Sequence, residues 1–206
     1  MSALRRLMPA AVAAALPVGA TAETYGKYEA PPYTVEARLG EVEIRAYAPH
    51  ILAEVRVQGD RRAALNAGFR VLAGYIFGGN TDGQDVAMTV PVAQSQTIDM
   101  TAPVTQTGTD GVWTVSFMMP RQWTLDTLPV PNSDAITFRK TEAHREAVLT
   151  FSGRASEAQL AAREAKLRAT LAAEGIETEG PVRHYYYDDP FTLPWARRNE
   201  VALRLR

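Results

Sequence analysis

The residues of this chain best suited to holding a metal or an anionic ligand are histidines, methionines and arginines. Imidazole nitrogen and thioether sulfur donate to transition metals, and the guanidinium group of arginine pairs with carboxylates. The chain has three histidines and six methionines among its 206 residues, and it has no cysteine. Thiolate ligation, disulfides and cysteine-based zinc sites are therefore excluded.

The three histidines differ in their sequence surroundings. His50 and His144 each stand at the head of a strand-like run after a turn, where polar residues are common, and His184 precedes three consecutive tyrosines. Neutral imidazole is a good ligand for iron, but a structural role is the stronger explanation for each of these positions. We keep His50 as the candidate metal ligand and leave the identity of the metal site unknown.

A phrase of five residues, M-T-[VA]-P-V, occurs twice, at 88–92 and at 100–104. Thr and Val favour extended backbone, and proline disfavours helix in the residue before it. Each copy is therefore predicted to be an extended segment near a sheet edge, with one methionine. Met88 could donate to iron or line an apolar wall, although methionine more commonly fills gaps in a core.

Overall charge and motif content restrict the classes of function. The chain has 22 basic and 23 acidic residues, a balance that argues against nucleic acid or an anionic membrane surface as the main partner. It contains no G-x-S-x-G, no H-E-x-x-H and no phosphate-binding glycine loop. Since no nucleophile–base pair stands out either, we predict a binding protein rather than an enzyme.

The first 22 residues have the pattern of a secretory signal peptide. Arg5 and Arg6 precede an apolar run at 7–18, and the segment ends in Ala20-Thr21-Ala22. The run is too short for a membrane span, so we expect cleavage near Ala22, a periplasmic location and no stable span after processing. Residues 23–32, ending in two prolines, are predicted to be an extended linker.

Strand-like runs recur along the remaining chain, with apolar and polar residues alternating or with β-branched and aromatic residues in series. We predict strands at 33–38, 41–47, 51–58, 112–118, 136–140, 145–152, 182–187 and 201–205.

Two helices are predicted between these strands. Asp60 is a suitable N-cap for a helix whose apolar residues recur at helical spacing over 65–76 and which ends at 78–80. Residues 156–159, Ser-Glu-Ala-Gln, form a capping-box pattern that opens the second helix, which ends near Gly175.

The two strand–Gly–helix units align with each other. The matched pairs at a separation of 94 are His50 with His144, Ala53 with Ala147, Val55 with Leu149, Val57 with Phe151 and Gly59 with Gly153, and at 95 they are Leu65 with Leu160, Leu72 with Leu167 and Ile76 with Leu171. We therefore predict one α+β domain over 33–206, with pseudo-twofold halves at about 33–104 and 112–206. A duplicated strand–helix unit would form a distorted antiparallel β-barrel or curved sheet flanked by two α-helices.

Several of these motifs, in this order, resemble the SOUL haem-binding protein family, here as an exported bacterial member. They include 42–47 (VEIRAY), both M-T-x-P-V copies, 115–120 (VSFMMP), 187–190 (YDDP) and 194–201 (PWARRNEV). The resemblance covers almost the whole chain from Tyr33. It implies reversible, non-covalent binding of haem or another porphyrin in a surface groove beside the first helix.

The family pattern also suggests which residues contact the ligand. Some members have a histidine ligand where this chain has Ala46, which cannot bind iron. Basic positions that other members have on the first helix correspond to Asn66 and Gly74 here, and one near the C-terminal loop corresponds to Leu193. Arg61, Arg62 and Arg70 on the same helix could replace those charges. The residues expected to bind the cofactor are Arg62, Asn66, Phe69, Arg70, Met88 and Leu193.

Three functions follow from these observations. The first is a periplasmic carrier or buffer for haem or a related tetrapyrrole, with an apolar groove and basic groups for the propionates. The second is a tetrapyrrole-modifying or haem-degrading enzyme, and the third is a binding module for another amphipathic small molecule.

Overall fold

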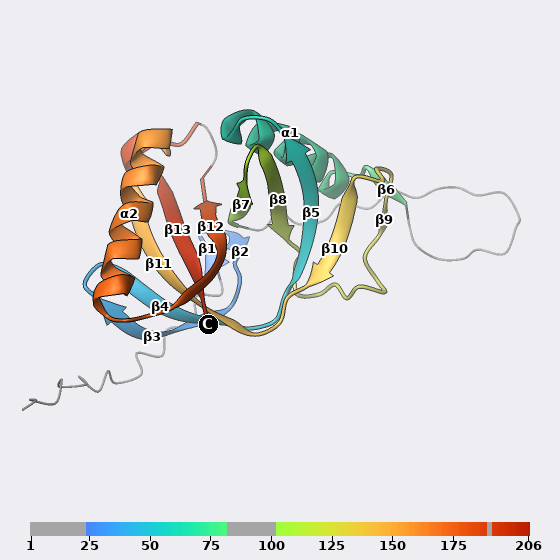
Figure 1. Cartoon of the computed structure of the whole chain (residues 1–206). Coiled ribbons are helices and arrows are strands. Elements are labelled where there is room, and N and C mark those ends of the chain that lie inside the picture. The colour runs from blue at the N-terminus through green and yellow to red at the C-terminus, as the bar shows by residue number, and fades with distance from the viewer. Residues whose placement is uncertain (1–23, 82–101, 189–190) are drawn as a thin grey trace, which may run out of the picture.

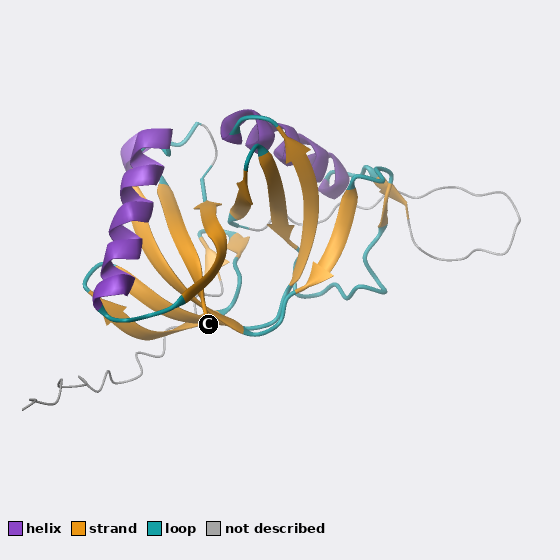
Figure 2. Cartoon of the chain, in the orientation of Figure 1, coloured by secondary structure: helices purple, strands orange, loops and turns teal. Residues whose placement is uncertain are grey.

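The computed structural model describes residues 24–81, 102–188 and 191–206. Nine antiparallel strands form one sheet in the order β10-β5-β8-β7-β12-β13-β11-β4-β3. Figure 1 and Figure 2 show the sheet strongly curved, with α1 and α2 packed outside its two ends. The predicted α+β class, with a curved sheet and two flanking helices, is therefore confirmed.

The elements agree closely with the sequence-based boundaries. The strands of the large sheet are β3 (Tyr33–Leu39), β4 (Val42–Tyr47), β5 (Ile51–Gln58), β7 (Val104–Thr109), β8 (Val112–Met118), β10 (Ile136–Lys140), β11 (His144–Ser152), β12 (Thr178–Tyr186) and β13 (Arg198–Leu205). The short strands are β1 (Thr24–Tyr25), β2 (Tyr28–Glu29), β6 (Asn80–Thr81) and β9 (Val130–Pro131). The helices are α1 (Arg61–Ile76), α2 (Glu157–Ala173) and the 3₁₀ helix η1 (Pro194–Ala196).

Both long helices begin at the predicted caps. The Asp60 side chain accepts a hydrogen bond from the Ala63 amide at 2.9 Å, and Ser156 accepts one from the Gln159 amide at 3.3 Å. Each cap satisfies an amide that the first helical turn leaves without a partner. Both helices begin at the same side of the molecule (Figure 1).

The duplicated units lie in two lobes that exchange strands. We call β5, β7, β8, β10 and α1 the α1 lobe, and β3, β4, β11, β12, β13 and α2 the α2 lobe. Strand β4 leads into β5 along the chain but pairs with β11, while β10 leads into β11 but pairs with β5. The lobes of the fold therefore differ from the halves of the sequence.

Each lobe has its own hydrophobic core. In the α1 lobe, Leu72 and Ile76 pack against β5 and β8, and in the α2 lobe Leu167 and Leu171 pack against β11 and β13. Gly68 allows α1 to approach the sheet, because a Cβ there would lie 2.6 Å from Val115 Cβ. The predicted helix faces are therefore the buried ones.

Two features differ from the sequence-based picture. The sheet does not close into a barrel, since β10 and β3 are its edges and the lobes join in the sheet through β7 and β12. Residues 24–29 form the hairpin β1–β2 rather than a plain linker, because Gly26, with φ +58°, allows a tight turn. The hairpin is held in place by the Ala102 amide, which donates to Glu29 O at 2.9 Å.

Candidate ligand-binding groove

A groove with a volume of about 1110 Å³ lies between the two lobes on the side where both helices begin. The first turns of α1 contribute one wall, and residues 154–157 at the start of α2 contribute the other. The hairpin β1–β2 and the ends of β12 and β13 complete the lining. This volume slightly exceeds the usual range for small-molecule pockets, which is about 300–1,000 Å³.

The α1 wall is largely apolar. Leu65 and Phe69 line it together with Ala102 and Val104 from the segment that enters β7. Phe69 is 37% exposed although its ring packs edge-on against buried Phe117, with 5.5 Å between centroids. An exposed aromatic held in this way offers a flat apolar surface to a ligand.

Arg61 joins the two walls. Its guanidinium pairs with Glu157 Oε1 at 2.8 Å and donates to Tyr186 OH at 2.5 Å and to Ala155 O at 3.2 Å. Gln106 donates to the Arg61 carbonyl at 2.7 Å. With 8% of its surface exposed, Arg61 has its charge satisfied within the protein and holds the start of α1 against the start of α2.

Other cations of the groove keep their charge available. Arg62 and Arg154 line opposite walls and form no ion pair with any described residue. The side-chain nitrogen of Lys27, which also lines the groove, lies 5.3 Å from the centroid of the Tyr28 ring. Because the nearby Glu157 is paired with Arg61, the groove presents an excess of positive charge to a ligand.

Tyrosines line the floor and the hairpin side. Tyr25 donates to Asp188 and Tyr187 donates to Glu200, whereas Tyr186 accepts from Arg61. Burial raises the pKa of Tyr186 to about 12, and the Arg61 charge opposes that rise. These hydroxyls are protonated at neutral pH and are fixed by protein partners.

The structure brings together half of the predicted cofactor-binding residues. Arg62, Asn66 and Phe69 line the groove. Arg70, whose Nε donates to Asn66 O, and Leu193, which is 55% exposed on the loop beside the groove, are not among its lining residues. Met88 lies outside the described residues.

Sequence reasoning missed the contributions of Arg154 and Lys27. Arg154 directly precedes the cap of α2, and Lys27 lies in the turn of the hairpin. The duplication offered a signal for Arg154, because Gly153 aligns with Gly59 and so places residue 154 opposite the start of α1. Nothing in the sequence indicated that residues 24–29 fold back onto the groove.

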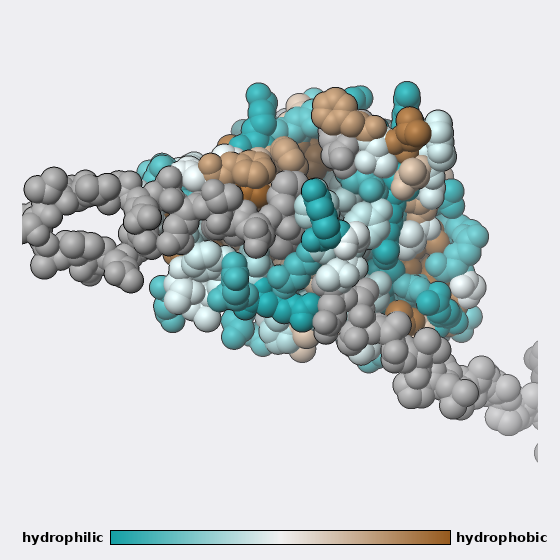
Figure 3. Space-filling view, turned by 180° about the vertical axis from the view of Figure 1, so that it is seen from behind, coloured by the Kyte–Doolittle hydropathy of each residue, from teal (hydrophilic) through white to brown (hydrophobic). Residues whose placement is uncertain are grey.

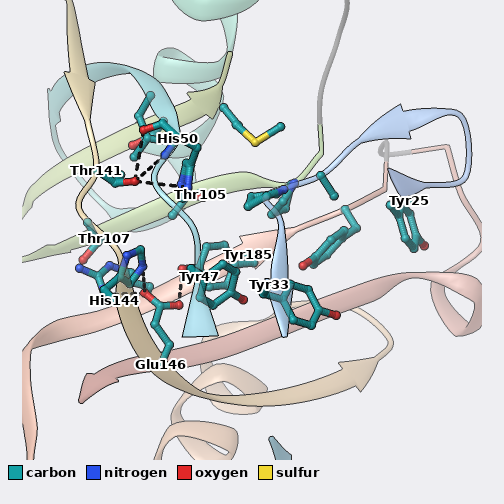
Figure 4. Close-up of a pocket in the computed structure, with 18 of the residues that line it drawn as sticks. Tyr25, Tyr33, Tyr47, His50, Thr105, Thr107, Thr141, His144, Glu146 and Tyr185 are labelled. Carbon is teal, nitrogen blue, oxygen red and sulfur yellow. Dashed lines mark hydrogen bonds and ion pairs between the residues drawn. The ribbon is translucent and has the colours of Figure 1, made fainter. Parts of the chain in front are cut away.

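His50 and His144 lie on the other face of the sheet, in a second cavity of about 100 Å³ that we call the polar pocket (Figure 4). His50 Nδ1 lies 2.9 Å from Ala48 O, and burial lowers the pKa of its ring. The structure therefore does not bring the candidate metal ligand His50 to the groove.

The polar pocket is lined by groups that satisfy one another. Glu146 is fully buried and accepts from Arg183 and from Tyr185, each at 2.7 Å. Burial would raise the pKa of the Glu146 carboxyl, but the hydrogen bond from His144 and the Arg183 charge hold it below its usual value.

A second buried ion pair adjoins the polar pocket. Arg45, whose side chain is 1% exposed, donates to both oxygens of Glu200 at 3.1 Å. Glu200 also accepts from Arg198 at 2.6 Å and from Tyr187 at 2.9 Å. Arg198 and Glu200 therefore form ion pairs that fix the last strand, β13, within the sheet.

His184 is buried beneath the groove. It is 5% exposed, and its Nδ1 has no hydrogen-bond partner among the described residues. Burial and the nearby Arg61 charge lower the pKa of its ring to about 4. The ring is therefore neutral at physiological pH.

The described part of the chain holds no group of three or more His, Asp or Glu side chains placed to bind a metal ion. Within residues 24–81, 102–188 and 191–206, no helix has the length and apolar character required to cross a bilayer.

Comparisons with known proteins agree with this architecture. The family model for "SOUL heme-binding protein" matches residues 28–204. The chain is 34% identical over 130 residues to "Heme-binding protein 1" of Sus scrofa, and this match covers 63% of the chain and 65% of the relative, slightly less than two thirds of the relative's length.

Solved structures share the fold at low sequence identity. A structure titled as a hydrolase from Listeria innocua has a TM-score of 0.52 and 14% identity, covering 81% of this chain and 92% of that one. The EcmrR C-terminal domain has a TM-score of 0.58 and 11% identity, with 80% and 96% covered. At these identities the likeness concerns the fold alone.

Proposed function

Because the chain belongs to the SOUL haem-binding protein family, we propose that the groove between its lobes binds haem or a related tetrapyrrole. The observation that carries the proposal is the combination of an apolar α1 wall with unpaired arginines on both sides of one large groove. A porphyrin has a flat apolar body and two anionic propionates, and these are the two features that the groove complements.

In this proposal, the residues that line the groove contact different parts of the ligand. Leu65 and Phe69 contact the macrocycle, while Arg62 and Arg154 pair with the propionates. When bound, the iron supplies the visible spectrum by which binding is followed. In this proposal, apolar and ionic contacts supply the affinity, through residues such as Leu65 and Arg62.

The signal-peptide pattern of residues 1–22 extends the proposal to an exported protein that carries or buffers the tetrapyrrole in the periplasm. Mass spectrometry of the protein purified from its native host tests this part. A mature N-terminus near Glu23 in the periplasmic fraction is expected, and an intact Met1 terminus contradicts export by cleavage.

An absorbance titration with haemin tests ligand binding. Wild-type protein is expected to shift the Soret band and to saturate at one equivalent. Phe69→Asp, which puts a charge on the apolar wall, is expected to weaken binding by at least tenfold, since burying an unpaired charge is strongly unfavourable.

His50→Ala is the control, because His50 lies in the polar pocket on the opposite sheet face. Its titration should match that of the wild type. The proposal is wrong if haemin gives no spectral change with the wild type, or if His50→Ala abolishes binding while Phe69→Asp leaves it intact.

A further inference from the structure

The loop that follows β12 exposes three large apolar side chains at the mouth of the groove. Phe191 is 93% exposed, Leu193 is 55% exposed and Trp195 is 73% exposed. They are the most closely spaced exposed large apolar residues in the described part of the chain. Figure 3 shows separate apolar patches between hydrophilic side chains along the upper edge of the molecule.

Residues 192–197 of this loop are held by hydrogen bonds, although the side chains of Leu193 and Trp195 are exposed. Pro194 O accepts from the Gly153 amide at 3.0 Å, and Arg197 Nε donates to Thr192 O at 2.7 Å. The 3₁₀ turn of η1 is closed by the Ala196 amide, which donates to Leu193 O at 2.9 Å. Because the backbone is fixed in this way, the exposed side chains are presented as a defined surface rather than by a frayed segment.

Positive charge surrounds the same surface. Arg197 follows η1 directly, and Arg154 follows Gly153, to which the loop is hydrogen-bonded. Arg62 and Lys27 line the groove that opens there. The overall charge of the chain is close to zero, so it is the fold that concentrates positive charge at this mouth.

We propose that this loop docks the protein on the surface of a lipid bilayer that contains anionic lipids, with the groove opening toward the bilayer. Trp and Phe partition into the interfacial region of membranes, and adjacent basic residues attract anionic headgroups. A stable protein partner would require a face of about 800 Å² on each side, whereas a bilayer needs only a few inserted side chains.

Docking in this position would place the groove where an amphipathic tetrapyrrole resides. The docking proposal does not depend on the proposed ligand, because the loop residues that insert are not groove-lining residues. It is therefore tested with protein to which no haemin has been added.

The experiment is co-sedimentation with unilamellar vesicles of phosphatidylethanolamine and phosphatidylglycerol, compared with phosphatidylcholine alone. Wild-type protein is expected to bind the anionic vesicles and to bind the zwitterionic ones more weakly. Phe191→Ser combined with Trp195→Ser is expected to reduce the partition coefficient by about tenfold or more, because two apolar side chains no longer insert.

Phe77→Ser is the matched control, since Phe77 is 64% exposed at the far end of α1. It should bind vesicles like the wild type. The proposal is overturned if the wild type does not bind anionic vesicles, if the double variant binds them equally well, or if Phe77→Ser causes the same loss. A haemin titration of the double variant should match the wild type, so failure of docking is distinguishable from failure of ligand binding.

Discussion

The groove and the polar pocket lie on opposite faces of one sheet and use charge in opposite ways. In the polar pocket, Glu146 and its neighbours pair with one another, and the remaining cavity is about 100 Å³. In the groove, Arg62 and Arg154 remain unpaired around a space of about 1110 Å³. The difference separates the charges that hold the sheet together from those available to a ligand.

This contrast explains why the presence of several arginines on a helix does not by itself show which of them are available to a ligand. Arg61 and Arg62 are neighbours in sequence, but Arg61 is buried in contact with Glu157 and Tyr186, while Arg62 faces the groove. Adjacent helical residues point about 100° apart, so one can join the lobes while the next meets solvent. The role of each cation follows from its partners.

We expect the largest loss of stability from a substitution that removes a buried charge next to the polar pocket. Glu200→Ala deprives buried Arg45 of its bidentate partner, although Glu43 remains paired with Arg45 at 2.6 Å. It also leaves Arg198 and Tyr187 without their acceptor, so we expect the free energy of unfolding to fall by about 3 kcal/mol. Urea unfolding measures the loss. Glu164→Ala, which breaks a partly exposed pair with Arg168, should cost less than about 1 kcal/mol. Equal losses for the two variants would contradict the structural role of the buried network.

Substitutions at two positions on α1 should affect stability and haemin binding differently. Leu72 is 1% exposed, and Leu72→Ala should reduce the free energy of unfolding by about 2–5 kcal/mol through lost burial and a cavity. Phe69→Ala should cost less stability because the ring is partly exposed, yet it should weaken haemin binding more than Leu72→Ala does. Thermal unfolding and haemin titration of both variants measure the two effects. A larger stability loss for Phe69→Ala would show that its ring belongs to the core.

The pH dependence of the free energy of unfolding should show the titration of His184, which is buried beneath the groove. Its folded pKa of about 4 lies below the unfolded value of about 6.5, so the unfolded chain takes up the proton first as pH falls. The contribution of the neutral His184 ring to the free energy of unfolding is fully present above pH 6.5. It is lost as the pH falls from 6.5 to 4, and the loss is at most about 3 kcal/mol.

Urea unfolding of the wild type and His184→Leu from pH 8 to 4 tests this expectation, since leucine does not titrate. The stability difference between the two proteins should change in favour of the variant as pH falls below 6.5. A difference that is constant across this range would show that the histidine titrates alike in both states.

The smallest expected effects concern single cations of the groove. Arg62→Ala and Arg154→Ala should each weaken haemin binding by about 1 kcal/mol, since the groove is open to water and screening is substantial. Added salt should weaken wild-type binding more than binding by either variant. Arg70→Ala is the control, because Arg70 does not line the groove. An equal effect of Arg70→Ala would mean that the charge of the helix, rather than position, determines affinity.

The sequence predicted local structure well and the assembled site only in part. The caps at Asp60 and Ser156 and the helix faces with Leu72 and Leu167 were predictable, because they depend on residue type and spacing within one element. Arg154 was not predicted, because its position in the groove depends on how two lobes meet across the β7–β12 pair. Such contacts have no periodic signature in the sequence.

The strand exchange between the lobes has a consequence for any attempt to divide this protein. A fragment ending before β8 would carry α1 and β5 but would lack β8 and β10, the two strands that flank β5. The complementary fragment would retain α2 and β11 without β4, which pairs with β11 over six residues. Neither repeat encodes a complete lobe. Two such fragments could regain the fold only by associating with each other. If each fragment were fused to a different protein, recovery of the fold would therefore report that the two fused proteins are close together.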